Sequence, residues 1–455
     1  MRSPAVPFRR LRVGTADRFV PAVLCAYLAA RALSAILLVA LTRYQVPVGW
    51  TGPHVSYATI VGLWDAGWYA DIATQGYPAV LPHDPVTGEL QQNPWAFYPL
   101  FPLLTRALMM LTGAPFAITG AMLSLVLGAA AAVVIARLLR RRVGARTALA
   151  AVIVWSTCAP SPVLQVAYTE SLAILLLTLV LAALDRQRWW SAAGFAVLTG
   201  LARPIAVPLG LVALVAVVVR WRGRAARPIP RGEYAAMAAA LGGCGVAGLT
   251  WPALVWAGTG IRTAYTDTMA TWRAGQDIVP LTPWVGISRY LFGDAGPLAL
   301  AAVVVLILAV ALGPWAARLG PVLRAWVLAY PFYLALVLDP GTSLFRYLLP
   351  CFPWAVIAVD GAWRARGVHA REASGDGGTS REPCEGRSDG EVDAPSPAGV
   401  LPPQPTAAPG VAAPDTAGAA RTWALTAGWV VLGLVTQWWW LYELWRFVPP
   451  SDFPP

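Results

Sequence analysis

The sequence predicts an all-α polytopic membrane protein, and three observations lead to this fold class. Hydrophobic residues make up 57% of the 455 residues and charged residues only 13%, about half the charged share of a soluble domain. The mean hydropathy is +0.58. The 22 tryptophans supply rings of the kind that gather at membrane interfaces. A soluble enzyme, a nucleic-acid module and a disordered scaffold are excluded for the whole chain, and the expected partner is a lipid bilayer.

Eleven apolar runs have a length that suits, or nearly suits, a bilayer crossing. A spanning helix needs about 20 apolar residues, because lipid offers the backbone no hydrogen-bond partner. Two of the runs, 147–162 and 189–203, are short. In chain order the predicted spans lie near 19–41, 115–139, 147–162, 166–184, 189–203, 204–220, 234–257, 297–313, 322–338, 345–362 and 422–443.

The direction of the spans follows from arginine. The chain has no lysine, so all 34 basic residues in the composition are arginine, and they cluster in short loops such as 140–146, 186–188 and 220–231. A cytoplasmic N-terminus puts every cluster on the cytoplasmic side, as the positive-inside rule expects. Counting 97–111 as a span would break this agreement, so we interpret that run as a helix at the outer interface.

Two long loops are then extracytoplasmic, 42–114 and 258–296. They contain most of the polar side chains that could take part in chemistry, including Asp65, Asp71, Asp84, Glu89, Asp267, Asp277 and Asp294. A membrane domain over 1–362 with these two loops is the expected main unit, and interfacial helices are expected in the first loop.

The chain after residue 362 divides into two parts that differ in amino-acid composition. Residues 365–420 have no aromatic residue and many Gly and Pro, so we expect a disordered cytoplasmic linker over 363–421. The last transmembrane helix and an outer tail then occupy 422–455. No internal repeat is visible, which weakens a transporter interpretation.

Asp65 is the first candidate for a catalytic residue. At helical spacing Asp65 and Tyr69 share a face, while Asp71 points elsewhere. Trp64 and Tyr69 are amphipathic rings, so this stretch has two interpretations. It is either an interfacial anchor with solvated acids or the site of a general base, since a partly desolvated carboxylate can accept a proton from a hydroxyl.

Three further charged residues lie at predicted span ends on the outer side. Glu170 is either a helix first-turn acid or a functional acid at the membrane boundary. Arg203 and Arg346 are either snorkelling anchors or ligands for a donor phosphate, because a nearby helix N-terminus also favours an anion. Arg31, in the middle of the first span, needs a partner that the sequence does not identify.

A metal site is not expected. The five cysteines are far apart, and His54 and His83 are scattered loop residues without a recognisable ligand set. We therefore predict no cofactor and no divalent metal.

Several segments together resemble the GT-C superfamily of lipid-phosphosugar-dependent glycosyltransferases, and most of all the PIG-V-type mannosyltransferases. The order and approximate spacing match over about residues 19–362. The segments are Trp64 to Tyr77, the run AFYPLFPL at 96–103, Tyr168-Thr169-Glu170-Ser171, Ala202-Arg203-Pro204 and Phe345-Arg346-Tyr347. The linker and eleventh span depart from the family pattern. Without lysine the chain looks bacterial, so the glycosylphosphatidylinositol acceptor of eukaryotic members is not carried over.

The resemblance implies a GT-C-like fold and a polyprenyl-phosphate sugar donor, usually of mannose, with Asp65 as the catalytic acid of the first outer loop. Arg203 and Arg346 would bind the donor phosphate, and Glu170, Tyr69, Tyr168, Trp64 and Asp71 would orient the substrates. The expected reaction is an inverting transfer to a glycolipid, glycan or protein hydroxyl outside the bacterial plasma membrane. A lipid-linked sugar flippase or other transporter, and a non-catalytic subunit of a transferase, are the alternatives.

Overall fold

The computed structural model describes residues 18–273, 278–359 and 416–449. These ranges contain helices and no strand, and their β-structure is limited to isolated bridge residues such as His83 and Leu90. Seven helices in them are long and apolar enough to cross a membrane, which confirms an all-α, multi-pass membrane protein. The count of eleven crossings stays a prediction. The seven are 19–41, 116–143, 206–225, 231–259, 282–312, 314–337 and 417–445.

The first half of the chain forms the part of the bundle that contains Asp65. Its α-helices are α1 (Phe19–Leu41), α2 (Tyr57–Val61), α3 (Asp65–Gln75), α4 (Leu100–Thr112), α5 (Phe116–Val143), α6 (Ala145–Thr157), α7 (Glu170–Asp185) and α8 (Trp189–Thr199). The helix α5 ends in Arg140–Arg142, which favour the negative end of a helix dipole, and Gly144, with φ 82°, reverses the chain.

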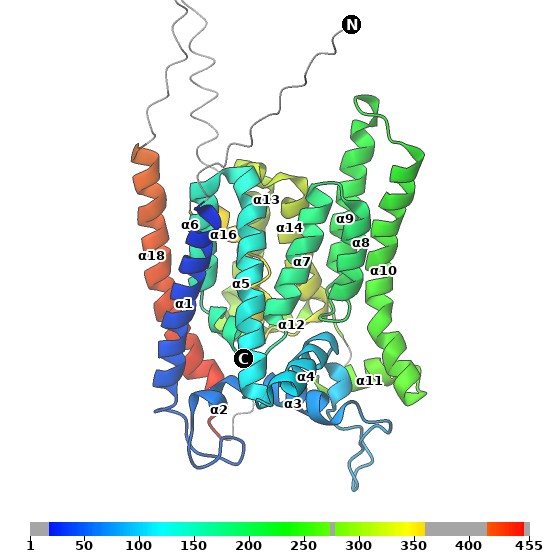
Figure 1. The fold of residues 1–455 in the computed structure, drawn as a ribbon, viewed down its shortest axis with the longest axis vertical. Helices are drawn as coiled ribbons and strands as arrows, with labels where there is room; N and C mark the ends of the chain where they lie inside the picture. The colour runs from blue at the N-terminus through cyan, green and yellow to red at the C-terminus, as the bar shows by residue number, and fades with distance from the viewer. Residues whose placement is uncertain (1–17, 274–277, 360–415, 450–455) are drawn as a thin grey trace, which may run out of the picture.

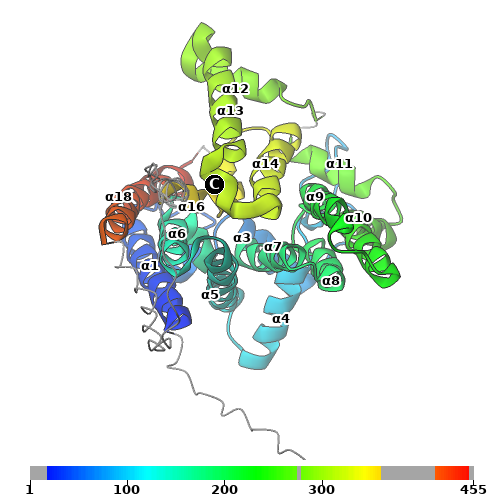
Figure 2. The ribbon, with the colours of Figure 1, turned by 90° about the horizontal axis from the view of Figure 1, so that it is seen from above.

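The second half completes the bundle. Its α-helices are α9 (Ala206–Arg222), α10 (Arg231–Thr259), α11 (Ala264–Thr271), α12 (Thr282–Phe292), α13 (Gly296–Leu312), α14 (Gly320–Val337), α15 (Leu344–Tyr347), α16 (Trp354–Ala358) and α18 (Thr416–Trp440). The pair α12 and α13 stands out from the bundle beside α14 (Figure 2). Only 11% of its apolar window is buried, as suits a surface that faces lipid.

One predicted span has a different structure. Over 345–362 we expected a continuous helix, but the described residues of this segment form the short helices α15 and α16 with turns between them. Pro350 and Pro353 lie in the break. Proline lacks an N–H and disfavours helical backbone in the residue before it, which explains the interruption.

The short helices of the first long loop lie together at one end of the bundle (Figure 1). They are α2, α3 and α4, and α4 takes up most of the run 97–111 that we interpreted as an interfacial helix, starting at Leu100. The helix α1 starts at the opposite end of the bundle, where α5 also ends in its arginines. The first long loop and the arginines that end α5 therefore lie at opposite ends of the bundle, and the orientation of the bundle in the membrane stays a prediction.

Much of the predicted linker, 363–415, lies outside the described residues, and so does the end of the predicted tail, 450–455. The last helix starts at Thr416 rather than at 422, because the alanine-rich residues before 422 are good helix formers.

A buried polar network attaches α18 to α1 and α6. The Arg31 guanidinium donates to the carbonyls of Ser156 and Ser161, so its partners are backbone groups and not an acid. Gln437 of α18 donates to Ser161 Oγ at 3.1 Å and accepts from Ser34 of α1 at 2.9 Å. Hydrogen-bonded polar residues inside a membrane bundle stabilise one arrangement of its helices.

We expect Gly433→Ala to destabilise the protein, because α18 approaches α6 closely at this residue. An added Cβ would lie 2.3 Å from the Thr157 carbonyl oxygen, so the backbones must move apart, a change that typically costs about 1–3 kcal/mol. The unfolding temperature in detergent measures the effect. Gly428→Ala in the same helix meets no atom within 4 Å and is the control. Equal unfolding temperatures for the two variants would contradict this packing.

Candidate active site

Asp65 is the first residue of α3, and an unusual backbone precedes it. Trp64 has φ 59° and ψ −126°, a conformation that is rare for a bulky residue. Such a conformation costs about 1–3 kcal/mol and persists only where surrounding contacts fix it. The Asp65 N–H donates to Tyr168 Oη at 3.1 Å, and the residue is only 9% exposed. These contacts therefore fix the orientation of Asp65, and its carboxylate is largely shielded from solvent.

Four charged side chains from distant segments, one of them Asp65, form a single cluster. Arg346 Nη1 of α15 lies 2.5 Å from Asp65 Oδ2 and 3.1 Å from Glu170 Oε1 of α7. Arg203 Nη2, from the turn between α8 and α9, lies 2.8 Å from the same Glu170 oxygen. Two acids and two arginines balance in charge, as a buried cluster requires.

The two arginines stay charged in this buried cluster, because a guanidinium does not lose its proton in proteins. The Arg346 guanidinium also lies 5.3 Å from the centre of the Tyr168 ring, a cation–π distance. Arg346 therefore contacts both acids and the tyrosine that bonds to the Asp65 backbone.

Two buried polar atoms of the cluster have no hydrogen-bond partner among the described residues, Glu170 Oε2 and Arg346 Nε. A buried carboxylate oxygen without a donor is costly. Costs of this kind are unusual in a purely structural ion pair and are more typical of a site that is arranged for function.

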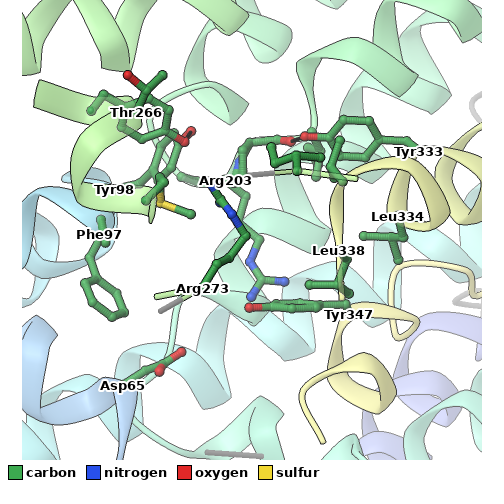
Figure 3. Close-up of a pocket in the computed structure, with 18 of the residues that line it drawn as sticks. Asp65, Phe97, Tyr98, Arg203, Thr266, Arg273, Tyr333, Leu334, Leu338 and Tyr347 are labelled. Atoms are coloured by element: carbon green, nitrogen blue, oxygen red, sulfur yellow. Dashed lines mark hydrogen bonds between the residues drawn. The ribbon is translucent and has the colours of Figure 1, made fainter. Parts of the chain in front are cut away.

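Asp65 opens onto a cavity of about 380 Å³ (Figure 3). Asp65 is the sole carboxylate among the described residues that line it, and Arg203 and Arg273 are the cations. Figure 3 shows Arg203 and Arg273 between Tyr98 and Tyr347. The Arg203 guanidinium lies 4.7 Å from the centre of the Tyr347 ring, a cation–π distance. The other aromatic residues of the wall are Tyr69, Phe97, Tyr265, Tyr330 and Tyr333.

Most of the predicted site residues come together in the structure. Asp65, Glu170, Arg203 and Arg346 form the charged cluster. Tyr168 bonds to the Asp65 backbone. Tyr69 lines the cavity and packs edge-on against the Phe97 and Phe101 rings.

Trp64 and Asp71 lie outside the cavity lining. The Trp64 indole instead donates to the carbonyl of Trp445, beyond α18, and Asp71 is exposed. Their role in orienting a substrate stays a prediction.

Sequence reasoning missed several residues of the wall. Arg273 and Tyr265 belong to the second long loop, and Tyr330 and Tyr333 belong to α14. Phe97, Tyr98 and Tyr347 had a signal, since each lies within one of the motif segments. A single tyrosine in an apolar helix gives no indication of which neighbour it faces.

No model of a known protein family matches the chain, and no curated protein matches it significantly. The resemblance to GT-C enzymes therefore stays a prediction, and the chemistry has to be argued from the cluster and its cavity.

Proposed function

We propose that the protein transfers a hexose, with mannose as the first candidate, from a polyprenyl-phosphate donor to an acceptor hydroxyl outside the bacterial plasma membrane. The observation that carries the proposal is the cavity, whose described lining has one carboxylate, Asp65, and two arginines, Arg203 and Arg273. In this proposal Asp65 is the general base, and the acceptor is a glycolipid, a glycan or a protein hydroxyl.

The reaction is a direct displacement at the anomeric carbon. The acceptor oxygen forms a bond to that carbon while the bond to the phosphate oxygen breaks, and Asp65 takes the proton of the acceptor hydroxyl. The donor phosphodiester carries one negative charge, and a second develops as the phosphate leaves. Asp65 and Glu170 balance Arg203 and Arg346 in charge, and the guanidinium groups of Arg203 and Arg273 that line the cavity suit this anion.

Arg346 acts through Asp65 in this mechanism. It does not line the cavity, and its contact with Asp65 Oδ2 turns Oδ1 toward the acceptor. The sequence-based assignment of Arg346 as a phosphate ligand is therefore replaced in the proposal by an orienting role. Arg203 keeps the phosphate role because it lines the cavity directly.

The charges argue against transport. A carrier for a lipid-linked sugar needs polar groups along its path through the membrane, whereas this cluster lies at the end of the bundle that holds α2 to α4. The two Nη groups of Arg31, deeper in the bundle, donate to backbone carbonyls and to a serine hydroxyl.

The purified protein provides the test. In lipid nanodiscs with radiolabelled polyprenyl-phosphate mannose and a membrane extract as acceptor, we expect release of polyprenyl phosphate together with a labelled glycosylated product. Flipping of the donor in proteoliposomes without its cleavage would contradict the proposal in favour of a transporter. Cleavage that needs a second polypeptide would favour a non-catalytic subunit.

A further inference from the structure

The last described helix reaches the site from the far end of the sequence. After α18 the chain forms a single π-type turn, Leu441–Trp445, and π-type turns are frequent at functional sites. Trp440 and Trp445 are fully buried here, although the face of α18 before them is largely exposed. This end of α18 therefore packs far more tightly than a helix that only anchors the chain in lipid.

Two tryptophans connect this turn to the residue before Asp65. The Trp64 indole N–H donates to the Trp445 carbonyl at 2.7 Å. In the other direction, the Trp445 indole N–H donates to the Ile60 carbonyl at 3.0 Å. The segment 60–64, which ends in the strained Trp64, is thus held at both ends by one residue.

Phe447 adds a second attachment. Its ring stacks on Trp50 at 4.6 Å and meets the Trp64 ring edge-on at 5.5 Å. The Gln45 side chain donates to the Phe447 carbonyl at 2.8 Å and accepts from its N–H at 2.9 Å. These contacts fix the backbone of 445–447 against the start of the first long loop.

The same turn also supports the second group that holds Asp65. The rings of Trp445 and Tyr168 lie 5.3 Å apart, and Tyr168 Oη accepts the Asp65 N–H. Trp445 therefore contacts both Trp64, which precedes Asp65, and Tyr168, which bonds to its backbone.

We infer that residues 441–447, here called the C-terminal clamp, position Asp65 for the reaction, with Trp445 as the central positioning residue. Trp445 does not line the cavity, so it acts through Trp64 and Tyr168. The clamp holds Trp64 in its strained backbone, and this backbone directs the Asp65 carboxylate toward Arg346 and the cavity. The inference rests on the proposed role of Asp65, and it gives the last helix a function at the site.

Two substitutions of Trp445 test the clamp. Trp445→Phe keeps a ring against Tyr168 but removes the N–H that bonds to Ile60, and we expect kcat to fall about 10-fold. Trp445→Ala removes both contacts, and we expect a fall of about 100-fold, the scale of an ångström-sized misplacement. The KM for the donor should stay unchanged, because Trp445 does not touch the substrate. In the Asp65→Asn background, Trp445→Phe should cause no further loss.

A matched control lies in the same helix. The Trp429 indole donates to the Ala358 carbonyl at 3.0 Å, far along α18 from the clamp. Trp429→Phe removes an equivalent hydrogen bond and should leave kcat unchanged. An equal loss of kcat in Trp429→Phe and Trp445→Phe would overturn the inference, because it would reflect general loosening of α18.

Hydrogen exchange tests the clamp without any activity. In Trp445→Ala the backbone amides of 57–69 should exchange faster than in the wild type, while those of α11 stay unchanged. Unaltered exchange over 57–69 would overturn the clamp whatever the protein catalyses. Faster exchange in a protein that shows no sugar transfer would support the clamp and contradict the proposed function instead.

Discussion

Replacing Asp65 by asparagine is expected to lower the rate of sugar transfer by about 100-fold or more, the scale of a missing general base. Asparagine has nearly the same shape as aspartate and still accepts a hydrogen bond from Arg346, but it does not take a proton from the acceptor hydroxyl. The measurement is the initial rate of transfer from polyprenyl-phosphate mannose in membranes that contain equal amounts of each protein.

Asp84→Asn is the matched control for this prediction. Asp84 lies in the same long loop, and its carboxylate caps a turn by accepting from the N–H groups of Val86 and Thr87 at 2.8 Å. Asparagine keeps that acceptor, and Asp84 does not line the cavity, so transfer should remain at the wild-type rate. Wild-type transfer by Asp65→Asn would remove the base from the mechanism.

Removing Arg346 should have the largest effect on stability. Arg346→Ala leaves Asp65 and Glu170 buried, close together and without their shared cation. Breaking a buried ion pair by deleting one partner typically costs about 3–5 kcal/mol, so we expect poor insertion or a much lower unfolding temperature in detergent. Arg346→Lys keeps the positive charge and should recover most of this stability.

The lysine variant separates charge from geometry. One ammonium does not reproduce the planar fork with which Arg346 faces both acids, so we expect Arg346→Lys to fold but to transfer sugar at least about 10-fold more slowly than the wild type. If Arg346→Ala unfolded at the wild-type temperature, the ion-pair cluster would contribute nothing to folding and the account of the site would be wrong.

The sequence predicts which residues meet at the site better than it predicts how they meet. Asp65 is identified by the aromatic stretch around it in the first long loop, and Glu170, Arg203 and Arg346 are identified by their positions at predicted outer span ends. Their pairing is not, because Asp65 and Arg346 are separated by 281 positions and hydrophobic periodicity carries no information about such contacts. The two arginines therefore look like free phosphate ligands in the sequence, whereas in the structure both contact carboxylates.

The long apolar helices are the best-predicted part of the fold. The first predicted span, 19–41, coincides with α1, because an uninterrupted apolar run has few alternatives in lipid. The predicted span 345–362 is not one continuous helix in its described residues, because Pro350 and Pro353 interrupt it. The clamp after α18 was not predictable, because a tryptophan near a span end looks like any interfacial anchor.

The anomeric configuration of the product distinguishes a single displacement from a double one. In the proposed reaction Asp65 activates the acceptor for a single displacement, so the anomeric carbon inverts. Purified protein in nanodiscs would be given polyprenyl-phosphate mannose of known configuration, and the anomeric configuration of the product would be read by NMR. Inversion is the predicted result. Retention would mean that a group on the protein attacks the sugar first, as in retaining glycosidases, and it would contradict the assignment of Asp65 as a base.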